Sequence, residues 1–61
     1  MKAAEIKLGT EIEYFRVSSE GCRGIVIANS LSDGDEVIAV AWFEGGVLKV
    51  NVNDVYIVGA D

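Results

Sequence analysis

The stretch that decides the fold is Val37-Ile-Ala-Val-Ala-Trp-Phe43, in which every residue is apolar. A glycine turn, Glu44-Gly45-Gly46, follows it, and then comes Val47-Leu-Lys-Val-Asn-Val52. Two runs rich in β-branched and aromatic residues, joined by a short glycine turn, are the pattern of a β-hairpin. The first strand of this hairpin is apolar on both faces, which is unusual in a chain of 61 residues.

The first strand of the hairpin, expected at residues 36–43, offers two candidate core sets because side chains alternate between the faces of a strand. The bulkier set is Ile38, Val40 and Trp42. The smaller set is Val37, Ala39, Ala41 and Phe43. We predict that the bulkier set fills the interior and that the smaller set lies outside.

Outward from the hairpin, short apolar runs are separated by Gly, Ser, Asn and Asp, and the chain has no proline. An earlier strand is expected at residues 10–18, with Ile12 and Tyr14 on its core face. Phe15 then falls on the opposite face, so either the strand bulges there or Phe15 lies outside the core. Another strand is expected at residues 22–30, with apolar side chains on both faces.

The second strand of the hairpin is expected at residues 47–52, after a two-residue corner at Gly45-Gly46. Its predicted inward side chains are Leu48, Val50 and Val52. Asn53-Asp54 is expected to begin a single 3-10 turn, and residues 56–58 to form the closing strand. The sequence therefore predicts an all-β fold over residues 1–61: one small antiparallel five-stranded barrel with a 3-10 turn before the last strand.

Several motifs resemble those of SH3-like barrels, in the right order along nearly the whole chain. Gly9-Thr-Glu-Ile12 is similar to their glycine-then-strand opening, and Gly24-Ile-Val26 is similar to their second-strand G-x-V. Val40-Ala-Trp-Phe-Glu-Gly45 resembles the V-x-W-x-x-G hairpin of Tudor-like and KOW-like modules. Asn53-Asp-Val-Tyr-Ile-Val58 resembles the 3-10 turn and final strand. The resemblance implies an SH3-like barrel, and such a fold does not by itself assign a function.

Size and charge narrow the classes of function. A chain this short buries only about 60% of its unfolded surface, so oligomerisation is a common source of extra stability. With Cys22 as the only cysteine and no histidine, no internal disulfide or Cys/His zinc site is expected. A net charge of −5 disfavours direct binding to nucleic acid or to an anionic membrane. The same charge suits a partner protein with a basic surface.

The compartment is also suggested by the sequence. Residues 1–6 lack the apolar core of a signal peptide, and no run reaches transmembrane length. A single unpaired cysteine is typical of a reducing compartment, so we expect a cytoplasmic protein.

Residues suited to catalysis or metal binding are sparse. Without histidine the commonest general base is missing, and Cys22 has no imidazole to activate it. Asp33-Gly34-Asp35-Glu36 offers three carboxylates, but it is only a fragment of a twelve-residue EF-hand frame, and a solvated turn explains it. Glu11 and Glu13 share one strand face, as on any exposed strand. We therefore expect no catalytic residue, metal site or cofactor, and a protein that is not an enzyme.

The aromatic residues raise an alternative. Tudor-like domains hold methylated lysine or arginine in an aromatic cage by cation–π attraction, and Glu44 would add a counter-charge. The five aromatic residues are Tyr14, Phe15, Trp42, Phe43 and Tyr56. At least two of them, Tyr14 and Trp42, are expected in the core. This alternative is a KOW-like or Tudor-like accessory module of a nucleic-acid-handling complex, in which a partner protein supplies the basic surface.

A second alternative is an enzyme. The layout is similar to type II dihydrofolate reductase, a small SH3-like barrel whose tetramer binds folate and NADPH in a central pore. That family has a Val-Gln-Ile-Tyr run in its late strand. The matching positions here are Val47, Leu48, Lys49 and Val50, of which only Val47 agrees. The missing glutamine and tyrosine remove most of the polar recognition that this family uses.

The apolar surface left outside the core makes the best physical case for a working site. Its candidate residues are Val37, Ala39, Ala41, Phe43, Glu44, Ile25 and Ile27. Soluble monomers rarely expose a contiguous apolar patch beyond a few hundred Å². Either a second copy of the chain or a target protein covers this patch, or the strand bends across the barrel and buries both of its sides within one chain.

The leading functional hypothesis is a small acidic, non-enzymatic protein-interaction module. Compact acidic chains of this kind are similar in character to small bacterial or phage-encoded regulators and inhibitors. The expected partner is another protein, with a homodimer as the alternative, and direct contact with nucleic acid or membrane is not expected.

Overall fold

The computed structural model describes residues 2–15 and 22–59, whose strands form one antiparallel sheet of five. The strands are β1 (Glu11–Tyr14), β2 (Arg23–Ala28), β3 (Val37–Trp42), β4 (Val47–Asn51) and β5 (Val55–Gly59). Two 3-10 turns complete the described elements: η1 (Ala3–Glu5) and η2 (Val52–Asp54). The predicted all-β class, the five antiparallel strands and the 3-10 turn before the last strand are confirmed. No helix in these ranges is long and apolar enough to cross a membrane.

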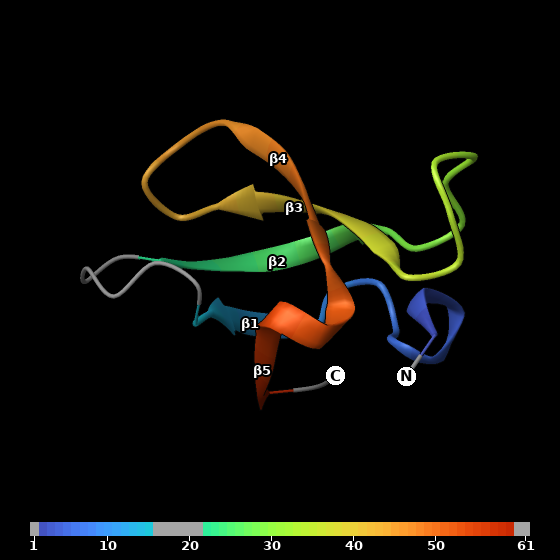
Figure 1. Cartoon of the computed structure of the whole chain (residues 1–61). Helices are drawn as coiled ribbons and strands as arrows, with labels where there is room; N and C mark the ends of the chain where they lie inside the picture. The colour runs from blue at the N-terminus through green and yellow to red at the C-terminus, as the bar shows by residue number, and fades with distance from the viewer. Residues whose placement is uncertain (1, 16–21, 60–61) are drawn as a thin grey trace.

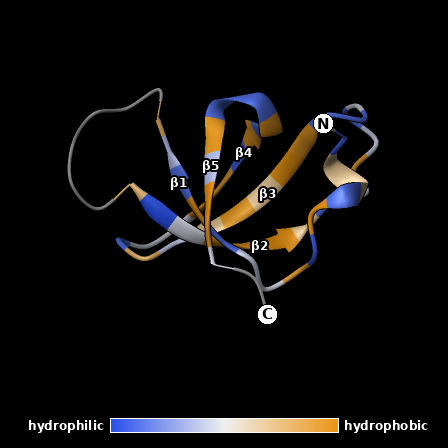
Figure 2. Cartoon of the chain, turned by 90° about the horizontal axis from the view of Figure 1, so that it is seen from below, coloured by the Kyte–Doolittle hydropathy of each residue, from blue (hydrophilic) through white to orange (hydrophobic). Residues whose placement is uncertain are grey.

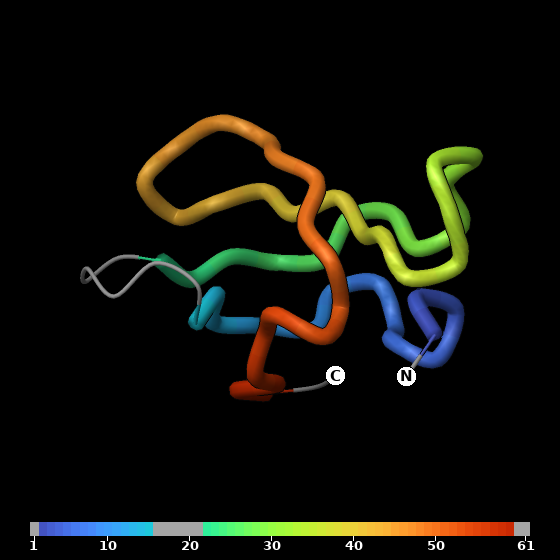
Figure 3. Tube along the Cα trace, in the orientation of Figure 1, coloured from blue at the N-terminus to red at the C-terminus, as the bar shows by residue number. Residues whose placement is uncertain are grey.

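The strand order is β4-β3-β2-β1-β5, so the last strand returns to pair with the first (Figure 1). The chain trace in Figure 3 shows the path: β2, β3 and β4 follow one another as a meander, and η2 then redirects the chain toward β1. The sheet curls around its buried side chains, which is compatible with a small β-barrel-like fold. β4 and β5 are left as the two edges of the sheet.

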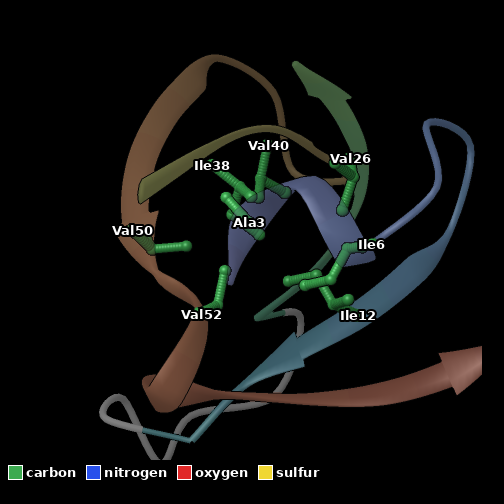
Figure 4. Close-up of a cluster of buried hydrophobic side chains, with 8 residues drawn as sticks. All are labelled: Ala3, Ile6, Ile12, Val26, Ile38, Val40, Val50 and Val52. Atoms are coloured by element: carbon green, nitrogen blue, oxygen red, sulfur yellow. The ribbon is translucent and has the colours of Figure 1, made fainter. Parts of the chain in front are cut away.

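The core is aliphatic and comes from almost every element (Figure 4). Its buried members are Ala3, Ile6, Ile12, Val26, Ile38, Val40, Val50 and Val52. Ile38 and Val40 have no exposed surface, and Trp42 packs against the cluster while remaining half-buried. The prediction that the bulkier set of β3 fills the interior is therefore confirmed.

The N-terminal segment contributes to the core, which the sequence did not reveal. Figure 4 shows Ala3 and Ile6 among side chains that come from the strands. The Ala3 N–H donates to the Asp35 carbonyl at 2.7 Å, and the Asn29 side-chain amide donates to the Ile6 carbonyl at 2.6 Å. A segment with helix-favouring composition thus forms one 3-10 turn that fills the interior of the curved sheet.

Two details of the β3–β4 hairpin differ from prediction. The prediction that Leu48 faces inward is wrong, because its side chain is 56% exposed. Leu48 stands opposite Val40 in the register, but β4 is an edge strand, so no further strand lies beside Leu48 to cover it. The connection also has four residues, 43–46, instead of two. Gly45 and Gly46 both take positive φ, at 115° and 83°, which glycine adopts without strain.

The β1 and η2 regions resolve two smaller questions. Phe15 lies outside the core, and the pairing irregularity falls between Glu11 and Ile12 instead of near Phe15. The side chain that caps η2 is Asn51, whose oxygen accepts from the Asn53 N–H at 2.8 Å. The sequence placed the start of the turn at Asn53, whereas the structure has the capping residue two positions earlier, at Asn51.

Candidate interaction face

One row of side chains crosses three strands on the convex, outer side of the sheet and ends on the β3–β4 connection. Glu13 of β1 is paired with Tyr56 of β5 on one side and with Arg23 of β2 on the other. The row continues to Phe43, whose N–H donates to the Arg23 carbonyl at 2.9 Å. These positions alternate with Ile12, Gly24 and Trp42, which face the core. The row therefore has an aromatic ring at each end and opposite charges in its middle.

A second row on the same side is mostly apolar. Its consecutive cross-strand partners are Gly59, Glu11, Ile25, Ala41 and Val47. Ile25 and Ala41 are half-buried, and Val47 is exposed. Figure 2 shows the same contrast by hydropathy, with β3 coloured hydrophobic along most of its length and hydrophilic segments in β1. We call the two rows together the outer face.

Charges in the centre of the outer face compensate one another. The Arg23 guanidinium lies 3.7 Å from a Glu11 carboxylate oxygen and 3.5 Å from a Glu13 oxygen. All three side chains are partly exposed, so each contact contributes at most about 1 kcal/mol to stability. Their effect is to hold one cation between two anions and to leave a single net negative charge between the aromatic ends.

The structure spreads the seven residues predicted for an interface over different environments. Phe43 and Glu44 are exposed at the hairpin connection, and Phe43 has an exposed fraction of 60%. Ile27 is exposed, while Ile25, Ala41 and Val37 are half-buried. Ala39 is only 8% exposed and offers almost no surface. The accessible parts of the predicted patch are therefore Phe43 and Glu44 at the end of β3, and Ile27 separately on β2.

The low exposure of Ala39 has a local origin. Ala39 stands between Ala28 on β2 and Lys49 on β4. The Lys49 ammonium reaches an Asp33 carboxylate at 2.6 Å, which ties the β2–β3 connection to β4 on this side of the sheet. Long lysine stems cover apolar surface while their charge stays in water. Ala39 is thus flanked on both sides, by Ala28 and by a lysine whose ammonium is held by the β2–β3 connection.

Several members of the outer face were not among the predicted interface residues. Tyr56 and Phe15 enter the sequence analysis only in the aromatic-cage alternative, and Arg23 is in none of the predicted sites. The rings of Phe15 and Tyr56 pack together, with centroids 4.9 Å apart. Period-two alternation indicates the face of each residue within its own strand. It does not indicate that Tyr56 lies beside Glu13, because that depends on the β1–β5 register.

The aromatic residues do not converge on one site. Tyr14 and Trp42 pack with ring centroids 5.9 Å apart against the core, as expected, whereas Phe15 and Tyr56 pair on the outer face. Phe43 stands at the far end of the row from Tyr56. A cage needs several rings around one cation, and here the rings are divided between the two sides of the sheet. The Trp42 indole N–H is buried and finds no hydrogen-bond partner among residues 2–15 and 22–59.

The acidic turn is held by ion pairs. Besides the Lys49–Asp33 pair, the Lys2 ammonium lies 3.1 Å from an Asp35 carboxylate oxygen. Within residues 2–15 and 22–59, no three His, Cys, Asp or Glu side chains are grouped so that they could hold a metal ion. The two ion pairs fasten Lys2, which caps η1, and β4 to the β2–β3 connection.

The positions compared with type II dihydrofolate reductase lie along the β4 edge. Val47, Leu48 and Lys49 are exposed and Val50 is buried in the core. The exposed three offer two aliphatic side chains and an ammonium that is already paired with Asp33. Comparison with known proteins adds no relative: no family model, curated protein or solved structure matches the chain.

Proposed function

We propose that this chain is a non-enzymatic protein-interaction module that binds a basic surface of a partner protein through the Phe43 end of its outer face. The observation that carries the proposal is the exposure of Phe43 beside Glu44 on the hairpin connection. Aromatic residues, phenylalanine included, are enriched in the buried core of protein interfaces. A carboxylate beside it selects for a cation on the partner.

The distribution of charge supports a basic partner. The cations Lys2, Arg23 and Lys49 are each engaged by a carboxylate of the same chain. In the part of the chain that the structure describes, Glu44 has no ion pair, and the net charge of the chain is −5. Three of the five cations of the chain are therefore already paired within it. Opposite charge on the partner would raise the association rate and orient the encounter.

The topology supports an SH3-like assignment for the same module. A sheet ordered β4-β3-β2-β1-β5, with a 3-10 turn immediately before β5, has the arrangement that the short motifs imply. Such barrels serve many unrelated functions, so the binding hypothesis rests on the outer face and not on the fold.

Substitution at Phe43 tests the proposal. Immobilised wild-type chain and Phe43→Asp are compared for partner capture, and the captured protein is then titrated against each by calorimetry. We expect Phe43→Asp to weaken binding by about 2 kcal/mol or more, as for a buried aromatic anchor. We also expect affinity to fall as salt is raised, because screening weakens attraction to a basic surface.

The matched control is Leu8→Asp. Leu8 is about as exposed as Phe43 but belongs to the segment between η1 and β1, which Figure 1 shows apart from the β3–β4 connection. This variant adds the same charge elsewhere and should bind like wild type. Undiminished binding by Phe43→Asp, with its circular dichroism spectrum unchanged, would refute the proposed face.

A further inference from the structure

β5, one of the two edge strands of the sheet, is apolar and exposed, and the proposed function does not involve it. β5 pairs with β1 on one side and is the end strand of the order, at the lower edge of the molecule in Figure 1. Three consecutive side chains on it are exposed: Tyr56 by 60%, Ile57 by 49% and Val58 by 43%. Since consecutive residues of a strand point to opposite faces, β5 is apolar and accessible on both sides.

Natural proteins protect such edges with charge, proline or irregular backbone, because an exposed edge is a template for pairing with another chain. The segment Val55–Gly59 contains neither a charged residue nor a proline. Its one irregularity is the register shift opposite Glu11 and Ile12. The other edge differs, since β4 carries Lys49 at its centre, tied to Asp33. β5 is therefore the less protected of the two edges.

We propose that β5 is a dimerisation strand, which pairs antiparallel with β5 of a second copy of this chain about a two-fold axis near Ile57. Identical strands can meet in this way because an antiparallel pair is its own two-fold mate. The pairing would place exposed aromatic and β-branched side chains opposite one another, a favourable combination across strands. Both sheets would then join into one continuous sheet.

Charge favours a second copy over a basic or acidic peptide as the occupant. Two chains of net charge −5 repel each other, so self-association needs a contact free of carboxylates. The uncharged segment Val55–Gly59 is such a contact. On the neighbouring strand, Arg23 offsets one of the two negative charges of Glu11 and Glu13. A charged peptide would gain no electrostatic attraction from the uncharged β5 strand. A second, identical β5 strand would bury no charge there and so would pay no desolvation cost for one.

The area available sets the expected strength. A stable interface buries roughly 800 Å² on each partner, which is roughly a fifth of the 3,814 Å² surface of the described chain. One strand edge offers less than this, even when Phe15, which stacks on Tyr56, joins the contact. We therefore expect a weak dimer with a dissociation constant in the micromolar range.

Sedimentation equilibrium over about 1–500 μM tests the association, with Val58→Lys as the edge variant. A lysine on the edge strand should raise the dissociation constant at least tenfold, since each introduced ammonium group would be buried against the uncharged β5 strand of the other copy. Val47→Lys is the matched control: it makes the same change at an exposed valine of the β4 edge, and it should dimerise like wild type. Circular dichroism confirms folding of each variant.

Cross-linking decides the geometry even if Val58→Lys does not fold. In a Cys22→Ser background, Val58→Cys should be joined into covalent dimers by a short bis-maleimide, and Val47→Cys should not. A wild-type chain that stays monomeric throughout, equal loss of dimer in both lysine variants, or cross-linking through residue 47 would each overturn the proposal. Protection of β5 amides only when a foreign peptide is added would also overturn it. Phe43→Asp should leave dimerisation intact, which separates this result from the proposed function.

Discussion

At the scale of single residues, Gly24 shows how tightly β2 and β3 approach. A Cβ atom at this position would lie 2.5 Å from the Val40 Cγ1 atom and 2.6 Å from the Ala41 carbonyl oxygen. The second of these neighbours is backbone and cannot rotate away. Gly24 is therefore required by the space between the strands, since it faces the core side opposite Trp42.

We expect Gly24→Ala to lower the free energy of unfolding by about 1–3 kcal/mol, as overpacking does. Urea denaturation measures the change. Gly59→Ala is the control, because no atom lies within 4 Å of a Cβ built there. Equal stability of the two variants would mean that the strands can separate without cost.

At the scale of elements, η2 depends on one side chain. The Asn51 oxygen satisfies the Asn53 N–H, which has no helical partner at the start of a 3-10 turn. This turn redirects the chain from β4 to β5. Its cap therefore contributes to closing the sheet as well as to the turn itself.

We predict that Asn51→Ala costs about 0.5–2 kcal/mol of stability, the usual effect of removing an N-terminal cap. Thermal unfolding provides the measurement. Asn53→Ala keeps the backbone N–H and removes only an exposed side chain, so it should change stability by less than about 0.5 kcal/mol. The reverse order of the two variants would contradict the capping role.

The N-terminal segment is a second element whose contribution to stability is not evident from its place in the chain. Ile6 is 2% exposed, and the carbonyl of the same residue accepts from Asn29. We expect Ile6→Ala to destabilise the chain by about 2–5 kcal/mol, since it empties space inside the core. Denaturant titration compares it with Leu8→Ala, which trims an exposed aliphatic side chain two residues later. Similar losses in both variants would show that the N-terminal segment does not fill the core.

At the scale of the whole molecule, the β1–β5 pair joins the two ends of the chain. The register brings Tyr14 beside Val55 and Ile12 beside Ile57. Contacts between residues so distant in sequence require a large loop to close before they stabilise anything. This strand order therefore favours slower folding than a fold built from local contacts.

We expect single-exponential folding on the millisecond-to-second scale at about 25 °C, in the range of domains dominated by non-local β pairing. Stopped-flow fluorescence of Trp42, which packs against the core, reports the rate. Folding within microseconds would contradict the dominance of the end-to-end strand pair.

The candidate face was only partly predictable from the sequence. Alternation in β3 correctly placed Ile38 and Val40 in the core, because a strand fixes the sides of its own residues. The same rule put Ala39 on the accessible outer surface. There, however, Ala39 lies beside Lys49, whose ammonium pairs with Asp33, and it is only 8% exposed. Neighbours from other elements decide how much of an outward side chain remains accessible.

The sequence by itself determined the all-β class, the succession of five strands along the chain, the 3-10 turn before β5 and the interior side of β3. Each follows from local pattern: side-chain alternation, glycine turns and capping residues act within a few positions. Tertiary structure alone decided that Ala3 and Ile6 enter the core, that Tyr56, Glu13, Arg23 and Phe43 form one row, and that β5 is an open edge. These features depend on the pairing of segments far apart in the chain, and hydrogen-bond register and packing, not local pattern, select that pairing.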